Sequence, residues 1–144
     1  MPITVARLPD EPILIATFMG YITVDDIREM YQTVAALVAD EPGDFYRISD
    51  VSAGETNFLE MTKIVQTATQ DLPASSMDER IHVTYVGNSS WINFARDVFL
   101  KRGIMMAAFE NMDMALESVR WQIKQGKEAQ SHEEADSQEA VNNS

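Results

Sequence analysis

The chain has 144 residues, a length that fits one domain, and 45% of them are apolar, enough for a core without disulfides or metals. It contains no cysteine, which excludes disulfide frameworks, thiolate catalysis and cysteine-ligated zinc. The net charge of −12 argues against nonspecific binding to nucleic acids, because their phosphates require clustered Lys and Arg.

The two ends of the chain differ from its middle. The first residues, MPITVARLPDEPILI, lack the basic segment and unbroken apolar run of a secretion signal, and no apolar stretch approaches the roughly 20 residues of a membrane helix. We therefore expect a cytoplasmic protein without an integral membrane segment. Residues 126–144 hold one Lys and five acidic residues and almost no large apolar ones. This composition predicts a folded domain over residues 1–125 and a disordered acidic tail over 126–144.

The first two segments predict an antiparallel hairpin. Ile3–Leu8 alternates between apolar and polar residues, and Ile13–Met19 is a nearly continuous apolar run typical of a buried strand. The connection between them is too short for a crossover. Thr23 is then predicted to cap a helix, because apolar residues from Val24 to Val38 recur at steps of three and four.

Strands and helices alternate over the rest of the domain. The predicted strands are Phe45–Val51, Ile81–Val86 and Ile104–Phe109, and the predicted helices are Asn57–Leu72, Ser90–Arg102 and Met112–Gln125. The second helix is expected to bury an apolar stripe that begins with Phe58. The order β-β-α-β-α-β-α-β-α predicts an α/β fold with a five-stranded, mixed but mostly parallel sheet and four helices.

Four short motifs within residues 3–125 resemble STAS domains, the domains of anti-sigma-factor antagonists, and in particular their SpoIIAA-like branch. The motifs are Phe18-Met-Gly20-Tyr-Ile-Thr-Val-Asp-Asp, Tyr46-Arg-Ile-Ser-Asp50-Val-Ser, Val86-Gly87-Asn88-Ser89 and Phe109-Glu-Asn-Met-Asp-Met-Ala115-Leu116-Glu. The resemblance implies a STAS-like fold and a regulatory domain that binds proteins and does not catalyse a reaction.

The phosphorylation motif of such antagonists is absent. Phosphorylation-switched members carry Asp-Ser-Ser/Thr-Gly at the start of the second helix, where this chain reads Ser52-Ala-Gly-Glu-Thr56-Asn-Phe. Ser52 and Thr56 place hydroxyls near that point and are the candidate phosphorylation sites. The SpoIIAA-like branch commonly lacks the motif as well, and a lipid or other apolar ligand is one function considered for it.

A polar edge is predicted where the parallel strands end. Ligands of open α/β sheets gather at the carboxyl ends of the strands. The residues that we expect there, as a partner-binding edge, are Tyr21, Asp50, Ser52, Thr56, Asn88 and Ser89. Taken singly, each is also explained as an ordinary turn or capping residue.

The sequence offers no set of catalytic or metal-binding residues. No G-x-S-x-G turn occurs, His82 lies within a predicted strand and His132 in the tail, and no carboxylate spacing pairs the two histidines into a metal site. Catalysis would require Asp50 and His82 to converge within hydrogen-bonding distance. We therefore expect no enzymatic activity, no metal and no cofactor.

The helices carry more apolar residues than one stripe requires. Ile92 and Phe99 lie off the expected stripe of the third helix, Trp121 lies off that of the last helix, and the chain has nine Met. These residues indicate either helices packed from two sides or a surface for a homodimer, a protein partner or an apolar ligand. The predicted function is non-enzymatic docking of a protein or a second copy through the edge around Asp50–Phe58 and the third helix. The alternative is a carrier of a lipid or another small apolar molecule.

Overall fold

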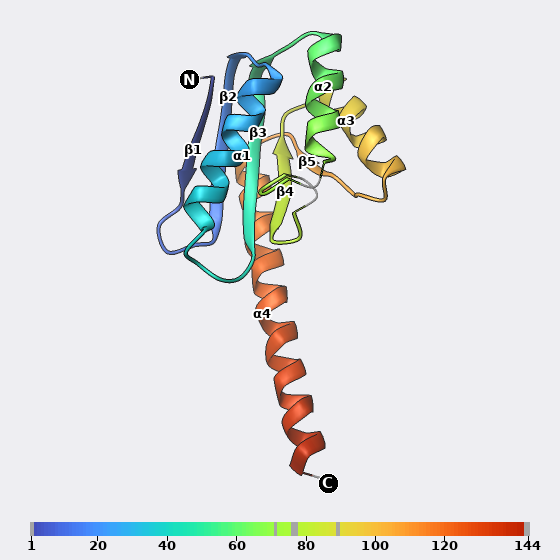
Figure 1. The fold of residues 1–144 in the computed structure, drawn as a ribbon. Coiled ribbons are helices and arrows are strands. Elements are labelled where there is room, and N and C mark those ends of the chain that lie inside the picture. The colour runs from blue at the N-terminus through green and yellow to red at the C-terminus, as the bar shows by residue number, and fades with distance from the viewer. Residues whose placement is uncertain (1, 71, 76–77, 89, 143–144) are drawn as a thin grey trace.

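The computed structural model describes residues 2–70, 72–75, 78–88 and 90–142, of which Trp91 and 128–142 are described by their backbone. Five strands and four helices follow one another in the predicted order (Figure 1). The strands are β1 (Ile3–Arg7), β2 (Ile13–Tyr21), β3 (Phe45–Glu55), β4 (Ile81–Val86) and β5 (Ala107–Phe109). The helices are α1 (Val24–Val38), α2 (Phe58–Ala68), α3 (Ser90–Lys101) and α4 (Met112–Asn142).

The five strands form one sheet in which their spatial order matches their order in the chain. β1 pairs antiparallel with β2, with Ile3 opposite Phe18, and the turn closes with a 3.0 Å hydrogen bond from the Leu8 N–H to the Ile13 carbonyl. The pairs β2–β3, β3–β4 and β4–β5 are all parallel. The hairpin and the mixed, mostly parallel sheet predicted from the sequence are confirmed.

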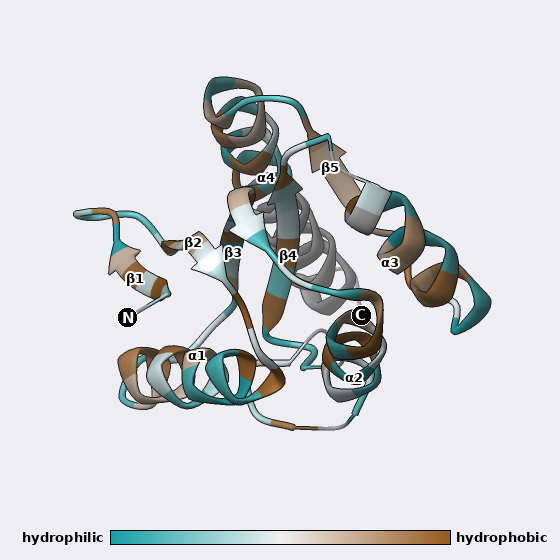
Figure 2. Ribbon diagram, turned by 90° about the horizontal axis from the view of Figure 1, so that it is seen from above, coloured by the Kyte–Doolittle hydropathy of each residue, from teal (hydrophilic) through white to brown (hydrophobic). Residues whose placement is uncertain are grey.

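The helices cover both faces of the sheet (Figure 2). Alternation along β3 directs Phe45 toward α1, α2 and α3 and Ile48 toward α4, so each face builds its own core. Leu14 and Val34 lie fully buried in the core under α1, and Val119 lies fully buried in the core under α4. A domain of this size thus forms a three-layer α/β/α sandwich.

Thr23 caps α1 as the sequence predicts. Its hydroxyl accepts a 3.4 Å hydrogen bond from the Asp26 N–H, and Asp26 Oδ2 in turn accepts one of 2.8 Å from the Thr23 N–H. This reciprocal pair satisfies two backbone donors that the first helical turn would otherwise leave free. The cap fixes the point at which the chain leaves β2 and turns back over the sheet.

Two residues of α3 that lie off its expected apolar stripe are buried. Ile92 is 5% and Phe99 2% exposed, so of the two interpretations of these residues, core packing holds and a surplus surface does not. The helix is rotated so that Ile92 and Phe99 enter the core, while Phe94, Ala95 and Val98 are partly buried and pack against it. Trp121 of α4, by contrast, is 62% exposed.

α4 extends past Gln125, its predicted end, to Asn142, and its second half leaves the sheet (Figure 1). The sequence after Gly126 contains no proline and many Glu, Ala and Gln residues, which favour helix. The part of α4 beyond the sheet has no core to pack on. The disorder expected for residues 126–144 therefore stays a prediction. None of the helices among the described residues combines the length and apolar character needed to cross a membrane.

Near its start, α4 is also tied to the β1–β2 hairpin. The Arg120 guanidinium donates two hydrogen bonds of 3.0 Å to the two carboxylate oxygens of Glu11. These bonds lower the pKa of the Glu11 carboxyl and raise that of Arg120. Because both groups are solvent-exposed, the pair orients α4 more than it stabilises the fold.

Candidate functional site

Tyr21 and Thr56 meet where β2 and β3 end and α2 begins. The Tyr21 hydroxyl accepts a 2.7 Å hydrogen bond from Asn57 Nδ2, and the Thr56 hydroxyl donates one of 2.9 Å to the Ile22 carbonyl. Asn57 also caps α2, since its Oδ1 accepts from the Glu60 N–H at 2.8 Å. The sequence did not single out Asn57, although an Asn three residues before a Glu is typical of a helix start.

Asp50 and Ser52 form a local turn near the end of β3. Asp50 Oδ1 accepts hydrogen bonds from the Ser52 N–H at 3.1 Å and from the Ser52 hydroxyl at 2.5 Å. The donors to the half-buried carboxylate are therefore those of Ser52. The arrangement is an Asx turn, which orients Ser52 toward solvent.

The turn between β4 and α3 lies beside the end of β3. The Gly87 N–H donates to the Phe109 carbonyl at 2.9 Å, which also fixes the end of β5. The Gly87 Cα lies so close to Val51 and to the Ser52 backbone that a Cβ there would be 3.3 Å and 3.6 Å from them. Asn88 follows and is exposed, so the structure brings it to the same end of the sheet as Ser52. Ser89 lies outside the described residues.

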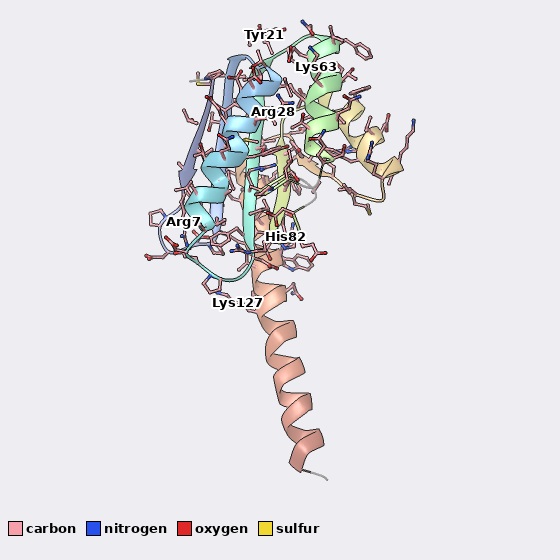
Figure 3. The ribbon with its side chains drawn as sticks, in the orientation of Figure 1. Arg7, Tyr21, Arg28, Lys63, His82 and Lys127 are labelled. Atoms are coloured by element: carbon pink, nitrogen blue, oxygen red, sulfur yellow. The ribbon has the colours of Figure 1, made fainter. Side chains whose placement is uncertain are left out.

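Asp50 and His82 do not converge, and a catalytic pair of the two is excluded. Asp50 lies opposite Val86, whereas His82 lies opposite Tyr46, four residues earlier along β4. At roughly 3.3 Å per residue this separates them by about 13 Å along the sheet. His82 is instead 3.2 Å from Asp44, at the end of the sheet opposite to Tyr21 (Figure 3). Among the described residues, no three His, Asp or Glu side chains are close enough to hold a metal ion.

Tyr46, which lies at the same end of the sheet as His82, makes the stability of the protein depend on pH. Its ring stacks on His82 with the centroids 4.8 Å apart, and burial, followed by the negative charge of Asp44, raises the pKa of its hydroxyl. The folded protein thus holds the phenol proton more tightly than the unfolded chain. The protonated Tyr46 hydroxyl therefore stabilises the folded state. This stabilisation is complete below the pKa of about 10 in the unfolded chain, and it is lost as the pH rises through the higher pKa in the folded protein.

We therefore expect the free energy of unfolding to fall above about pH 10, and Tyr46→Phe to remove part of this fall. Urea denaturation of the wild type and the variant, followed across this range, measures the difference. An unchanged slope in Tyr46→Phe would contradict the assignment.

Exposed apolar side chains surround the polar residues at the upper end of the sheet. We define the docking edge as four such residues, whose exposed fractions are 63% for Met19, 51% for Tyr21, 67% for Phe58 and 66% for Leu59. Phe58 was expected in the core. It lies in the first turn of α2, beyond the end of β3, and the edge of the Phe94 ring packs beside it at a centroid distance of 5.7 Å.

A cavity of about 90 Å³ lies behind the docking edge, between the sheet and α1, α2 and α3. Most of its walls are apolar, but Arg47 and Ser49 of β3 also line it, and each is only 1% exposed. Arg47 Nη1 donates to the Ala74 carbonyl at 2.7 Å, and the guanidinium carbon lies 5.3 Å from the centre of the Tyr31 ring. Arg47 Nε and Ser49 Oγ have no hydrogen-bond partner among the described residues.

Arg47 was not among the residues predicted from the sequence, although the sequence contains a signal for it. In the predicted strand Phe45–Val51, alternation places Arg47 and Ser49 on the face shared with Phe45 and Val51. A strand in the middle of a mostly parallel sheet is covered on both faces, so a charged residue on it is buried. Recognising β3 as the central strand would have identified the pair.

Comparison with solved structures establishes the fold class. An uncharacterised protein of the DUF3478 family with a SpoIIAA-like fold, from Shewanella loihica PV-4, matches 80% of this chain and 90% of its own with a TM-score of 0.53 and 15% identity. This chain has a SpoIIAA-like fold. An anti-sigma factor antagonist from Mycobacterium paratuberculosis matches 82% of this chain and 94% of its own, with a TM-score of 0.50 and 18% identity. No protein-family model and no curated protein matches the sequence.

In this chain, the stretch of residues 52–58 spans the end of β3 and the start of α2. Ser52 is exposed there, with its hydroxyl bonded to Asp50. The Thr56 hydroxyl is partly buried and bonded to the Ile22 carbonyl. Of the two candidate phosphorylation sites, Ser52 is therefore the more accessible.

Proposed function

We propose that this chain is a non-enzymatic, cytoplasmic protein-interaction domain that binds its partner through the docking edge. The observation that carries the proposal is the exposure of four large apolar side chains, each more than half exposed, at one end of the sheet. Two of them are aromatic and one is Met, and these residue types are enriched at the centres of protein interfaces. The match to an anti-sigma factor antagonist supports a protein as the partner.

The charge of the domain indicates what the partner surface looks like. Residues 1–125 carry a net charge of about −8, since the tail accounts for −4 of the total −12. Glu55 and Glu60 stand beside the docking edge, on the end of β3 and the first turn of α2. We infer a partner with an apolar groove bordered by Lys or Arg, because complementary charge accelerates association and disfavours other proteins.

The double variant Phe58→Ser/Leu59→Ser is expected to weaken partner binding at least tenfold without unfolding the domain. Truncation of interface aromatic residues typically costs about 2 kcal/mol or more, whereas exposed residues contribute little to stability. The partner is identified by mass spectrometry after capture from native lysate and is then purified. Its dissociation constant is measured with the wild type, the double variant and a control.

The matched control is Leu100→Ser/Met105→Ser, which changes two side chains exposed by 60% and 88% outside the docking edge. It should bind the partner as the wild type does. Light scattering after gel filtration tests whether the partner is a second copy of the chain. Equal affinities of the double variant and the control would overturn the docking edge as the interface.

Ser52 offers a means of regulating this interface. Phosphate on its hydroxyl would break the 2.5 Å hydrogen bond to Asp50 and place two negative groups side by side. In the proposed scheme this repulsion opens the turn next to the docking edge and releases the partner. Ser52→Asp in the same binding assay should lower the affinity, while Ser52→Ala should not. Phosphorylation of Ser52 in the native source is checked by phosphoproteomics.

A further inference from the structure

The cavity contains a buried positive charge that forms no ion pair with any residue that the structure describes. Arg47 is 1% exposed, and none of the ion pairs among the described residues includes it. Its known contacts are the Ala74 carbonyl and the face of the Tyr31 ring, which are dipolar and quadrupolar partners. Buried charges in folded proteins are normally paired, because an isolated one is strongly disfavoured.

Two polar atoms on the cavity wall also lack partners. Arg47 Nε is a donor and Ser49 Oγ is a donor and acceptor, and neither makes a hydrogen bond within the described residues. The two residues stand two positions apart on β3 and therefore point to the same face of the sheet. Unsatisfied buried groups are rare in native proteins, and two of them on one cavity wall indicate a ligand.

The rest of the wall determines what kind of ligand fits. The apolar lining side chains include Phe18, Met30, Met61, Ile92, Phe99 and Met106. An apolar wall of this kind suits a hydrocarbon tail, and the thioether chains of the three Met can move to admit a longer one. A cavity of about 90 Å³ is smaller than an engineered one of about 150 Å³ that holds benzene, so a tail of five or six carbon atoms enters only when the Met side chains move aside.

We propose that this cavity binds a small carboxylic acid with an apolar tail. The carboxylate accepts hydrogen bonds from Arg47 Nε and Ser49 Oγ, and it neutralises the guanidinium. A carboxylate fits better than a phosphate, because one guanidinium and one hydroxyl offer too few donors for a buried dianion. This binding requires no protein partner and is independent of the docking function.

The lining of the cavity reaches the end of β3, next to the start of α2. Gly54, Glu55 and Thr56 belong to its lining, and Glu55 is exposed to solvent. A ligand that enters there passes the junction of β3 and α2 and meets Ser49 and then Arg47 deeper along β3. The docking variant Phe58→Ser/Leu59→Ser leaves Arg47 and Ser49 in place, and it should therefore still bind the acid.

The test is a titration of full-length protein, labelled with ¹³C at its Met methyl groups, with hexanoate and with 1-hexanol. We expect hexanoate to shift the signals of Met30, Met61 and Met106, which line the cavity, and to leave those of exposed Met19 and Met105 unchanged. The alcohol has the same tail without the charge, and it should bind about tenfold to a hundredfold more weakly. Equal binding of the two, or no shift at the three cavity Met residues, would overturn the proposal.

Variants identify the head-group contacts. Arg47→Met replaces the guanidinium by an apolar chain of similar length, and it should abolish the preference for hexanoate over 1-hexanol. Ser49→Ala should weaken hexanoate binding several-fold, and Arg120→Met, which removes an exposed Arg, should not change it. If Arg47→Met does not fold, the affinities of Ser49→Ala and of the wild type for hexanoate and 1-hexanol decide whether the cavity prefers the acid. An unchanged preference in Ser49→Ala would show that Ser49 does not bind the carboxylate.

Discussion

Gly87→Ala is expected to destabilise the protein by about 3 kcal/mol, more than the same change at any other glycine. Gly87 has a φ of +141°, which side chains of L-residues rarely adopt, and it ends β4 at the turn into α3. A Cβ at this position would lie 3.1 Å from Ile92 Cδ1 and 3.3 Å from Val51 Cγ2. Both neighbours sit in packed elements, so the strain and the crowding add together.

Two other glycines separate these contributions. Gly43 has a φ of +97° but no atom within 4 Å of an added Cβ, so Gly43→Ala reports backbone strain alone. Gly126 lies in α4 with open space around it, and Gly126→Ala should stabilise the helix by up to about 1 kcal/mol. Urea unfolding followed by circular dichroism gives all three values. If Gly87→Ala lowers the free energy of unfolding no more than Gly43→Ala does, the close approach to Ile92 and Val51 does not contribute to the destabilisation.

Ile48→Ala is expected to lower the free energy of unfolding by about 3 kcal/mol and the melting temperature by roughly 10 °C. Ile48 is fully buried on the central strand β3, where it packs between the sheet and α4 in the core that contains Val119. Removing three carbon atoms there leaves a void that the neighbouring β2 and β4 cannot close, because both are held in register with β3.

Met105→Ala is the control for this change, since Met105 is 88% exposed and its loss should alter stability by less than about 0.5 kcal/mol. Ile48 also faces away from the cavity that Arg47 lines, so Ile48→Ala should keep the preference for hexanoate. A cost below about 1 kcal/mol would mean that the sheet and α4 can close together over the void.

Local patterns were sufficient to predict the elements of this fold. The bounds of β4 and α1 agree with the predicted ones, because Thr23 and the turn at Gly87 mark them in the sequence. β5 is shorter than predicted and begins at Ala107. The preceding segment is held by the end of α3 through a 2.9 Å hydrogen bond from the Ile104 N–H to the Phe99 carbonyl, and this contact is not visible as an apolar pattern.

The candidate sites were less predictable because they depend on how the elements pack. Periodicity marks Phe58 as a core residue, yet its exposure follows from where α2 begins relative to β3. The rotation of α3 decides that Ile92 is buried, and the central position of β3 decides that Arg47 is enclosed. Such features become predictable only when the strand order is known, since that order determines which residues have neighbours on both sides.

The agreement between strand order in space and in the chain has a consequence for biosynthesis. During translation each strand emerges after the one beside which it will lie, so no strand has to be inserted later between two that are already paired. The β1–β2 hairpin can form first, and β3, β4 and β5 can then add to its open side in turn. The sheet can therefore grow from a single edge as the ribosome delivers it.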